Sequence, residues 1–362
     1  MSLAACQKKK VETANPFFEE WTTPYGVPPF DRIRPEHFLP AFERGMSLHN
    51  AEIDAIVDTS DEPTFENTIA AYDASGRMLQ RTSLIFEMLA ASDATPEMQA
   101  VEQEAMPLLA AHADEIRMNE RLFGRIKAVY DRREALPLTA EQRRLTEKLY
   151  RRFVRSGALL DEAGKRRLKE INGDLSRLSV KYGNNLLHEN DAFGLELTAD
   201  RLEGLPNAVR EAAREKAQAA GLGDKSYLFT LHKPSMLPFL SYAKDRKLRE
   251  ELYTAYLDRC NHGDEYDNKA LVNDYIRLRT EKAHLLGYDS FADYVTADQM
   301  AATPAAVYAL LDEIWTPALD RAGEELAEMD KLLQKDVPGA TFESWDWWYY
   351  AEKLRKQNYA LD

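Results

Sequence analysis

The sequence predicts an all-α fold in which long helices pack as hairpins, with a minor two-stranded β element near residues 193–231. Three observations predict it. Apolar residues recur at helical spacing over most of the chain, helix-capping patterns open several segments, and a single region alternates apolar with polar residues. Long helical segments joined by short connections are typical of helices that pack as hairpins.

The chain begins its regular pattern with an arm at residues 15–42 that is rich in proline and aromatic residues. Proline fixes φ and removes a backbone donor, so we expect this arm to be extended or turning. Because it carries so many aromatic side chains, we also expect it to pack on the body of the domain.

From Pro35 onward the pattern is helical. The first apolar face is formed by Phe38, Phe42, Gly45, Met46, Ile53 and Ile56. Thr95–Glu97 predicts a helix start with proline at the first position, and Thr139–Gln142 has the form of a capping box. Thr303-Pro304 opens another helix. Its apolar stripe consists of Val307, Leu310, Leu311 and Ile314.

The exception to the helical pattern lies between residues 190 and 232, where we place the internal seam of the chain. Phe193–Thr198 alternates apolar and polar residues, and Tyr227–Leu231 is rich in β-prone residues. We interpret these segments as two short strands that can pair, flanking a small helix near 205–219.

Composition and charge limit the classes of function. The chain has 362 residues, of which 44% are hydrophobic and 30% are charged, so it should fold as a soluble globular protein. Its 47 basic and 61 acidic residues give a net charge of −14. This balance disfavours nucleic acid as a partner, because phosphate binding needs clustered lysine and arginine. No apolar run is long enough to span a membrane.

Two cysteines, Cys6 and Cys260, are too few for a disulfide framework in a chain of this length. Ala4-Ala5-Cys6 resembles the end of a bacterial lipoprotein signal, which makes Cys6 the lipidation candidate and residues 1–14 a flexible tether. A lipid anchor would place the protein in the cell envelope or periplasm. The alternative is a disordered tail with an incidental cysteine, and a cytoplasmic protein.

No complete catalytic or metal-binding motif is present in the sequence. A metallopeptidase helix needs H-E-x-x-H, and the one histidine followed by glutamate is His188, with Ala192 four positions later. Cys260 and His262 precede an acidic run that could bind a metal. That run contains Asp264, Glu265 and Asp267. Because no second Cys/His pair exists, we favour an acidic connection between helices there.

Aromatic residues are densest at Trp345–Tyr350, which holds three of the five tryptophans. Trp345, Trp347 and Tyr350 are therefore candidates for a stacking wall beside a peptide or sugar. The interpretation that we favour is core packing, since Trp347, Tyr350 and Leu354 share one helix face. The helical pattern continues to Asp362, so we expect the chain to be interrupted there.

Several short motifs, taken together and in order, resemble the amino-terminal region of the thimet-oligopeptidase-like zinc peptidases. The motifs are Asn15-Pro16-Phe17, Pro29-Phe30-Asp31 with Ile33 and Pro35–Phe42, Phe65–Ile69, Leu286–Tyr294, Asp298–Ala301 with Thr303-Pro304, and Trp345–Lys353 with Arg355-Lys356. Within that family the peptidyl-dipeptidase (dipeptidyl carboxypeptidase) and oligopeptidase A branch is the most similar. The resemblance extends over residues 15–362.

The resemblance implies a mostly helical, two-lobed enzyme with a deep channel that admits short peptides, and one zinc ion on an H-E-x-x-H helix. That helix belongs downstream of Trp345, so the catalytic lobe is absent from this chain, and no catalytic or metal-binding residue can be assigned in it. We therefore expect residues 15–362 to form a channel-wall lobe of a zinc peptidase that removes carboxy-terminal dipeptides, inactive without its other half. The expected partners are short peptides and that catalytic lobe. The alternatives are an endo-acting oligopeptidase of the family and a non-catalytic helical module that binds peptides or proteins.

Overall fold

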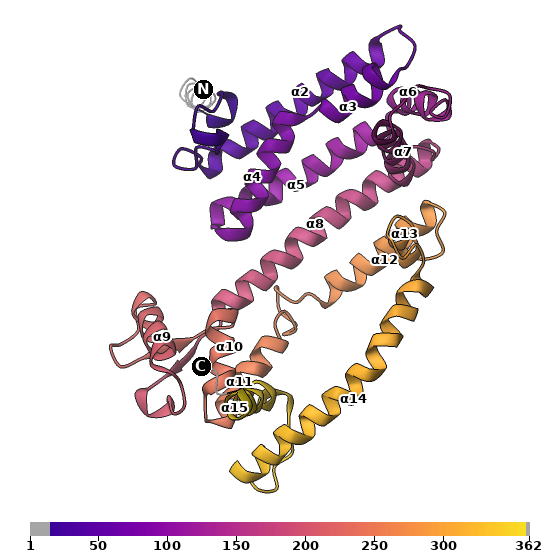
Figure 1. Ribbon diagram of the computed structural model, residues 1–362. Helices are drawn as coiled ribbons and strands as arrows, with labels where there is room; N and C mark the ends of the chain where they lie inside the picture. The colour runs from indigo at the N-terminus through magenta and orange to yellow at the C-terminus, as the bar shows by residue number, and fades with distance from the viewer. Residues whose placement is uncertain (1–14, 360–362) are drawn as a thin grey trace. The chain divides into compact units, whose positions relative to one another are not determined.

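A computed structural model describes residues 15–359, and most of this range is helical, which confirms the predicted all-α class (Figure 1). The described residues fall into two compact units, 15–181 with 275–291 and 182–274 with 292–359. Residues 190–232, where the sequence predicts a seam, lie inside the second unit. None of the helices between residues 15 and 359 combines the length and the apolarity of a membrane span.

The first unit consists of antiparallel helices and the aromatic arm. Its helices are α2 (Phe38–Asp58), α3 (Ala71–Ala74), α4 (Arg77–Ser92), α5 (Pro96–Arg117), α6 (Glu120–Asp131), α7 (Ala140–Arg155), and parts of α8 (Glu162–Ala192) and α12 (Lys269–Leu285). The arm packs on this unit as predicted, because Phe17 is buried with its ring 5.2 Å from that of Phe38. Phe38 in turn meets Phe86 of α4 edge to face at 5.1 Å.

Local sequence signals account for where these helices begin. The α2 face expected from the sequence is buried, except that Met46 is half-buried. The hydroxyl of Thr95 accepts a hydrogen bond from the backbone of Met98 at the start of α5. Thr139 and Gln142 form the predicted reciprocal capping box at the start of α7.

The second unit contains the β element. Besides the remaining parts of α8 and α12, it comprises β1 (Leu195–Leu197), α9 (Asn207–Ala219), β2 (Tyr227–Phe229), α10 (Lys233–Tyr242), α11 (Arg246–Leu257), most of α13 (Phe291–Thr296), α14 (Pro304–Asp336) and α15 (Trp347–Tyr359). The two strands pair antiparallel with Glu196 opposite Leu228, which confirms the prediction of two short paired strands that flank a small helix.

A glycine makes the close approach beside this β element possible. Gly204 has φ +92°, and a Cβ added there would lie 2.3 Å from the backbone oxygen of Tyr242. In contrast, Gly221 has φ +73° with nothing within 4 Å of an added Cβ. Gly204 is therefore required both by its backbone conformation and by its neighbour.

Helix α14 begins at Pro304 as predicted, with the hydroxyl of Thr303 accepting from the backbone of Ala306. Its carboxy-terminal end packs on α15 through the buried Met329 and Leu333 (Figure 1). The apolar stripe expected from the sequence at the start of α14 is largely exposed, whereas the predicted face of α2 is largely buried. Leu310, Leu311 and Ile314 are all more than half exposed, because no described residue covers them.

Candidate functional site

The described residues do not offer a zinc site. Between residues 15 and 359, no three or more histidine, cysteine, aspartate or glutamate side chains are grouped so that they could hold a metal ion. The sequence contains no H-E-x-x-H motif either. Because this donor set does not fit the metal that the family resemblance implies, we derive no chemical step through zinc from these residues.

The cysteine and histidine candidates lie in the connection between α11 and α12, as the favoured alternative predicts. Cys260 is buried, and burial raises the pKa of its thiol. His262 Nε2 lies 3.0 Å from Oε2 of Glu189, which comes from the end of α8. The backbone of Gly263, at φ +73°, donates to Asp267. These contacts fold the connection back on itself and hold it to α8.

The aromatic candidates of the last segment lie at the junction of α14 and α15. Tyr350 is 2% exposed and packs with Met329 and Leu333, while Trp347 and Leu354 are partly buried against the same cluster. Trp345 precedes α15, and Arg246 lies over its ring at 5.9 Å. Core packing of the Trp347 face is what the structure shows, and a channel-lining role for Trp345, Trp347 and Tyr350 stays a prediction. Cys6 lies outside the described residues.

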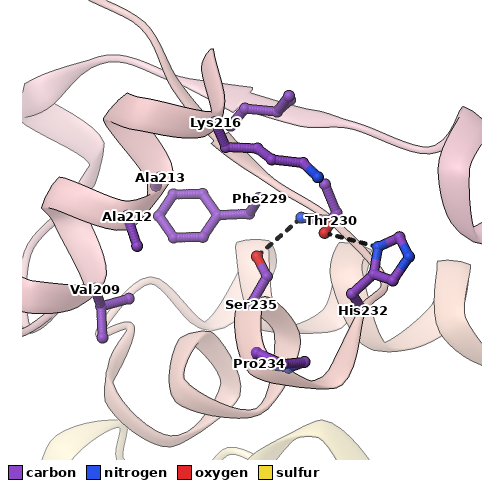
Figure 2. Close-up of a pocket in the computed structure, with 10 residues that line it drawn as sticks. Val209, Ala212, Ala213, Lys216, Phe229, Thr230, His232, Pro234 and Ser235 are labelled. Atoms are coloured by element: carbon purple, nitrogen blue, oxygen red, sulfur yellow. Dashed lines mark hydrogen bonds between the residues drawn. The ribbon is translucent and has the colours of Figure 1, made fainter. Parts of the chain in front are cut away.

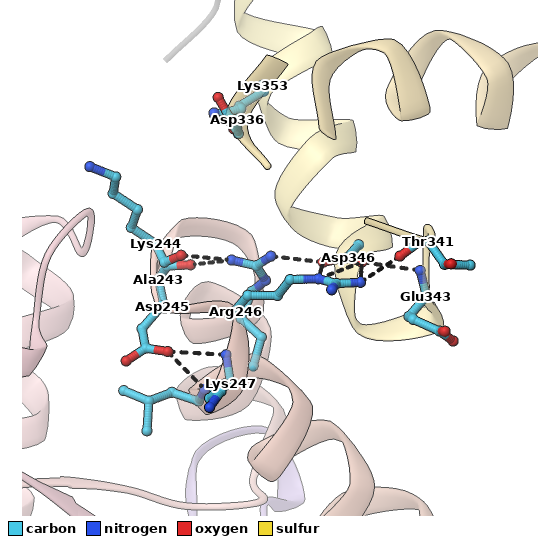
Figure 3. Close-up of polar contacts among 12 residues, drawn as sticks. Ala243, Lys244, Asp245, Arg246, Lys247, Asp336, Thr341, Glu343, Asp346 and Lys353 are labelled. Atoms are coloured by element: carbon cyan, nitrogen blue, oxygen red, sulfur yellow. Dashed lines mark hydrogen bonds and ion pairs between the residues drawn. The ribbon is translucent and has the colours of Figure 1, made fainter. Parts of the chain in front are cut away.

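A buried ion-pair network holds this junction to α11, and sequence analysis did not identify it (Figure 3). The carboxylate of Asp346 is fully buried and accepts hydrogen bonds from Arg246 Nη2 at 2.7 Å and from Arg249 Nη2 at 2.8 Å. The backbone of Glu343 donates to it as well, at 3.0 Å. Burial alone would raise the pKa of Asp346, but these donors outweigh it and hold the pKa below its ordinary value.

Arg249 is the most deeply placed charge of the network. Its side chain is 1% exposed, its Nη1 donates to the carbonyls of Ala243 and Lys244, and its guanidinium lies 4.2 Å from the ring centre of Tyr349. The spacing of Arg246 and Arg249, three apart on one helix face, is the signal that could have suggested a shared anion. Nothing in the sequence names Asp346 as that anion.

The first unit has its own polar pair, with His112 buried and His49 half-buried. His49 of α2 and His112 of α5 share a hydrogen bond between Nδ1 and Nε2 of 3.0 Å, and His49 Nε2 lies 3.2 Å from the hydroxyl of Ser75. Burial lowers the pKa of both imidazoles, and the proximity of His112 lowers that of His49 further. Both rings are therefore neutral at neutral pH, and the pair joins α2 to α5.

A small cavity of about 240 Å³ lies in the second unit between α9, β2 and the start of α10 (Figure 2). Both apolar and polar side chains line it. The lining residues are Val209, Ala212, Ala213, Lys216, Leu228, Phe229, Thr230, His232, Pro234 and Ser235. This volume is below the range of about 300–1,000 Å³ that is usual for ligand pockets.

Three polar side chains beside this cavity, Thr230, His232 and Asp191, follow one another in the order of a nucleophile, a base and an acid. Thr230 Oγ1 lies 3.3 Å from His232 Nδ1, and His232 Nε2 lies 3.3 Å from Asp191 Oδ1. Both contacts are longer than an activated pair requires, and Asp191 is 62% exposed. The backbone of Thr230 donates to Ser235, so it is not free to stabilise an oxyanion. This arrangement is a surface hydrogen-bond chain.

Comparison with known proteins gives the family. Residues 239–362 match the model of peptidase family M3. The chain is 36% identical to dipeptidyl carboxypeptidase of Escherichia coli over 97% of this chain and 51% of that protein. It is 35% identical to dipeptidyl carboxypeptidase of Salmonella typhimurium over 97% and 52%, and 30% identical to oligopeptidase A of Haemophilus influenzae over 93% and 50%.

The chain thus spans about half the length of the curated relatives it matches. These matches confirm the family resemblance of the sequence motifs: the chain belongs to peptidase family M3 and is similar to the amino-terminal half of dipeptidyl carboxypeptidase and oligopeptidase A.

Proposed function

We propose that this chain is the amino-terminal lobe of a zinc peptidase that removes dipeptides from the carboxyl end of short peptides, and that it forms one wall of the substrate channel. The observation that carries the proposal is the similarity over 97% of the chain to dipeptidyl carboxypeptidases. Identity to these proteins, at 36% and 35%, is higher than the 30% and 28% found for oligopeptidase A of two bacteria. This difference favours the dipeptide-releasing activity over the endo-acting alternative.

The lobe alone is proposed to be inactive, because a zinc peptidase needs histidine ligands and a general base that residues 15–359 do not bring together. Zinc is supplied in the whole enzyme by the other half, where it would polarise the scissile carbonyl. The contribution of this chain is then to bind and align peptides beside that centre.

The test compares this chain with the product of the complete reading frame, using metal analysis and peptide cleavage. The long form should bind about one zinc ion and release dipeptides from a short peptide, whereas this chain should do neither. A peptide amidated at its carboxyl end separates the two activities. A peptidyl-dipeptidase must hold the free carboxylate, so amidation should abolish cleavage, while an endo-acting enzyme should still cut. Zinc binding and cleavage by this chain alone would refute the proposal.

The compartment is a separate proposal that rests on Ala4-Ala5-Cys6. We infer that Cys6 is acylated and holds the enzyme at the cell envelope. Mass spectrometry of the amino-terminal peptide from the native protein decides it. A diacylglyceryl group on Cys6 supports the anchor, and an unmodified Cys6 removes it.

A further inference from the structure

Helix α14 has a large apolar surface that no described residue covers. The side chains that form it are Tyr308, Leu310, Leu311, Ile314, Trp315 and Leu319, and each is more than half exposed. We call these six residues the α14 face. Trp315 is 63% exposed, although tryptophan is among the side chains that gain most from burial. Exposed patches of this kind mark interaction surfaces in soluble proteins.

The α14 face continues a surface that is already buried at one end. On a helix with 3.6 residues per turn, Leu311, Trp315 and Leu319 follow one another along a row that leads through Leu326 to Leu333. Leu333 is fully buried against α15. The same side of the helix is therefore core at its carboxy-terminal end and exposed in the turns before it.

The opposite side of α14 carries charged side chains, as expected of a solvent-exposed surface. Glu313, Asp320 and Glu324 lie there, roughly half a turn from Leu311 and Trp315. No charged residue falls among the positions between Ile314 and Leu319 on the apolar side. Depletion of charged residues is typical of the core of a protein interface.

Two residues in the interior of α14 lower its stability in the absence of tertiary contacts. Pro317 lies in its interior, where it removes the hydrogen bond to the carbonyl of Glu313, and Gly323 follows within two turns. Most helical stability in proteins comes from packing of an amphipathic face rather than from intrinsic propensity. A 33-residue helix with these two residues inside it therefore needs tertiary contacts along its length.

We propose that the α14 face packs against the polypeptide that the family M3 relatives carry beyond the half to which this chain aligns; this inference rests on the proposed function. The relatives hold about as much chain again as the part that matches, which is ample to cover six large side chains. A helix that depends on its cover for its own stability favours a permanent partner in the same polypeptide over a peptide that comes and goes. The face also lacks the convergent polar groups that a peptide site needs.

The test measures the accessibility of single cysteines on the two sides of α14. Ile314→Cys probes the α14 face, and Leu311→Cys repeats the measurement on the same side. Ala309→Cys is the matched control, because Ala309 is exposed and lies on the opposite side. Cys6 is replaced by serine, and the buried Cys260 is retained. Each variant is made in this chain and in the product of the complete reading frame, and the rate of reaction with a maleimide is measured under native conditions.

In this chain, all three cysteines should react quickly. In the complete protein, Cys at 314 and at 311 should react at least about tenfold more slowly, because reaction then requires local opening, while Cys at 309 should be unchanged. Equal rates at 314 in both proteins would overturn the proposal. Protection of 314 in this chain alone, rising with concentration together with the sedimentation coefficient, would assign the face to a second copy and overturn it as well.

Peptide cleavage is measured on the same preparations of the complete protein. Protection without dipeptide release would leave the docking surface standing and refute the proposed function. Dipeptide release without protection would support the proposed function and refute the docking surface.

Discussion

Replacing Asp346 by asparagine tests how much the buried network of the second unit contributes to its stability. Asp346→Asn keeps the size of the side chain and removes its charge. The two guanidinium groups that point at it then meet an amide, whose nitrogen donates where a second acceptor is needed. The unpaired charge costs most free energy at Arg249, because its side chain is 1% exposed and cannot be hydrated.

The expected magnitude follows from burial. Removing one partner of a buried ion pair leaves an uncompensated charge and destabilises a protein by about 3–5 kcal/mol. Arg246 is 29% exposed and recovers some hydration when it loses the ion pair, whereas Arg249 is 1% exposed and recovers almost none, so the destabilisation by the whole substitution should fall within that range. With a urea dependence of about 2–3 kcal/mol per M, the midpoint of unfolding should fall by about 1–2.5 M.

Tryptophan fluorescence in urea is a suitable assay, because four of the five tryptophans belong to the second unit. Glu203→Gln is the control. It removes the charge of an ion pair with Lys244 in which both side chains are more than 60% exposed, and such pairs contribute about 0–1 kcal/mol. If Asp346→Asn shifts the midpoint no more than Glu203→Gln does, the network does not stabilise the unit and the reasoning from burial is wrong.

Two further substitutions test the other features of the fold. Gly204→Ala combines left-handed strain with the backbone clash described above and should destabilise the second unit by about 2–4 kcal/mol, whereas Gly221→Ala should lose only about 1 kcal/mol, both measured by urea unfolding. The pKa values of His49 and His112 are lowered in the folded chain, so their contribution to stability is present above about pH 6.5 and is lost as the pH falls from there through the lower folded values. His112→Gln should therefore reduce the drop in the urea midpoint of the first unit between about pH 7.5 and about pH 5.5, and an unchanged drop would show that other groups cause it.

The fold could be predicted where short-range signals decide it. The capping box at Thr139, the proline start at Pro96 and the alternation at Phe193–Thr198 each act within a few residues, and each is found where the sequence predicts it. The Cys260 connection was also predicted, because turn formers and the lack of further ligands are visible in the sequence.

What could not be predicted depends on contacts between distant positions. Asp346 meets Arg246 across 100 residues, and neither its burial nor its partners leave a local pattern. The apolar stripe of α14 shows a second limit of sequence-based prediction. Helical periodicity identifies an apolar face correctly, but it carries no information about which part of a polypeptide covers that face, and in the described residues nothing does.

The burial of Cys260 has a consequence for the redox environment that the protein can tolerate. A thiol needs to be accessible and deprotonated to react with oxidants or other thiols, and this one is 4% exposed with a raised pKa. It is the single cysteine among residues 15–359. This part of the chain should therefore keep the same covalent structure in an oxidising and in a reducing environment, so Cys260 sets no requirement on the compartment.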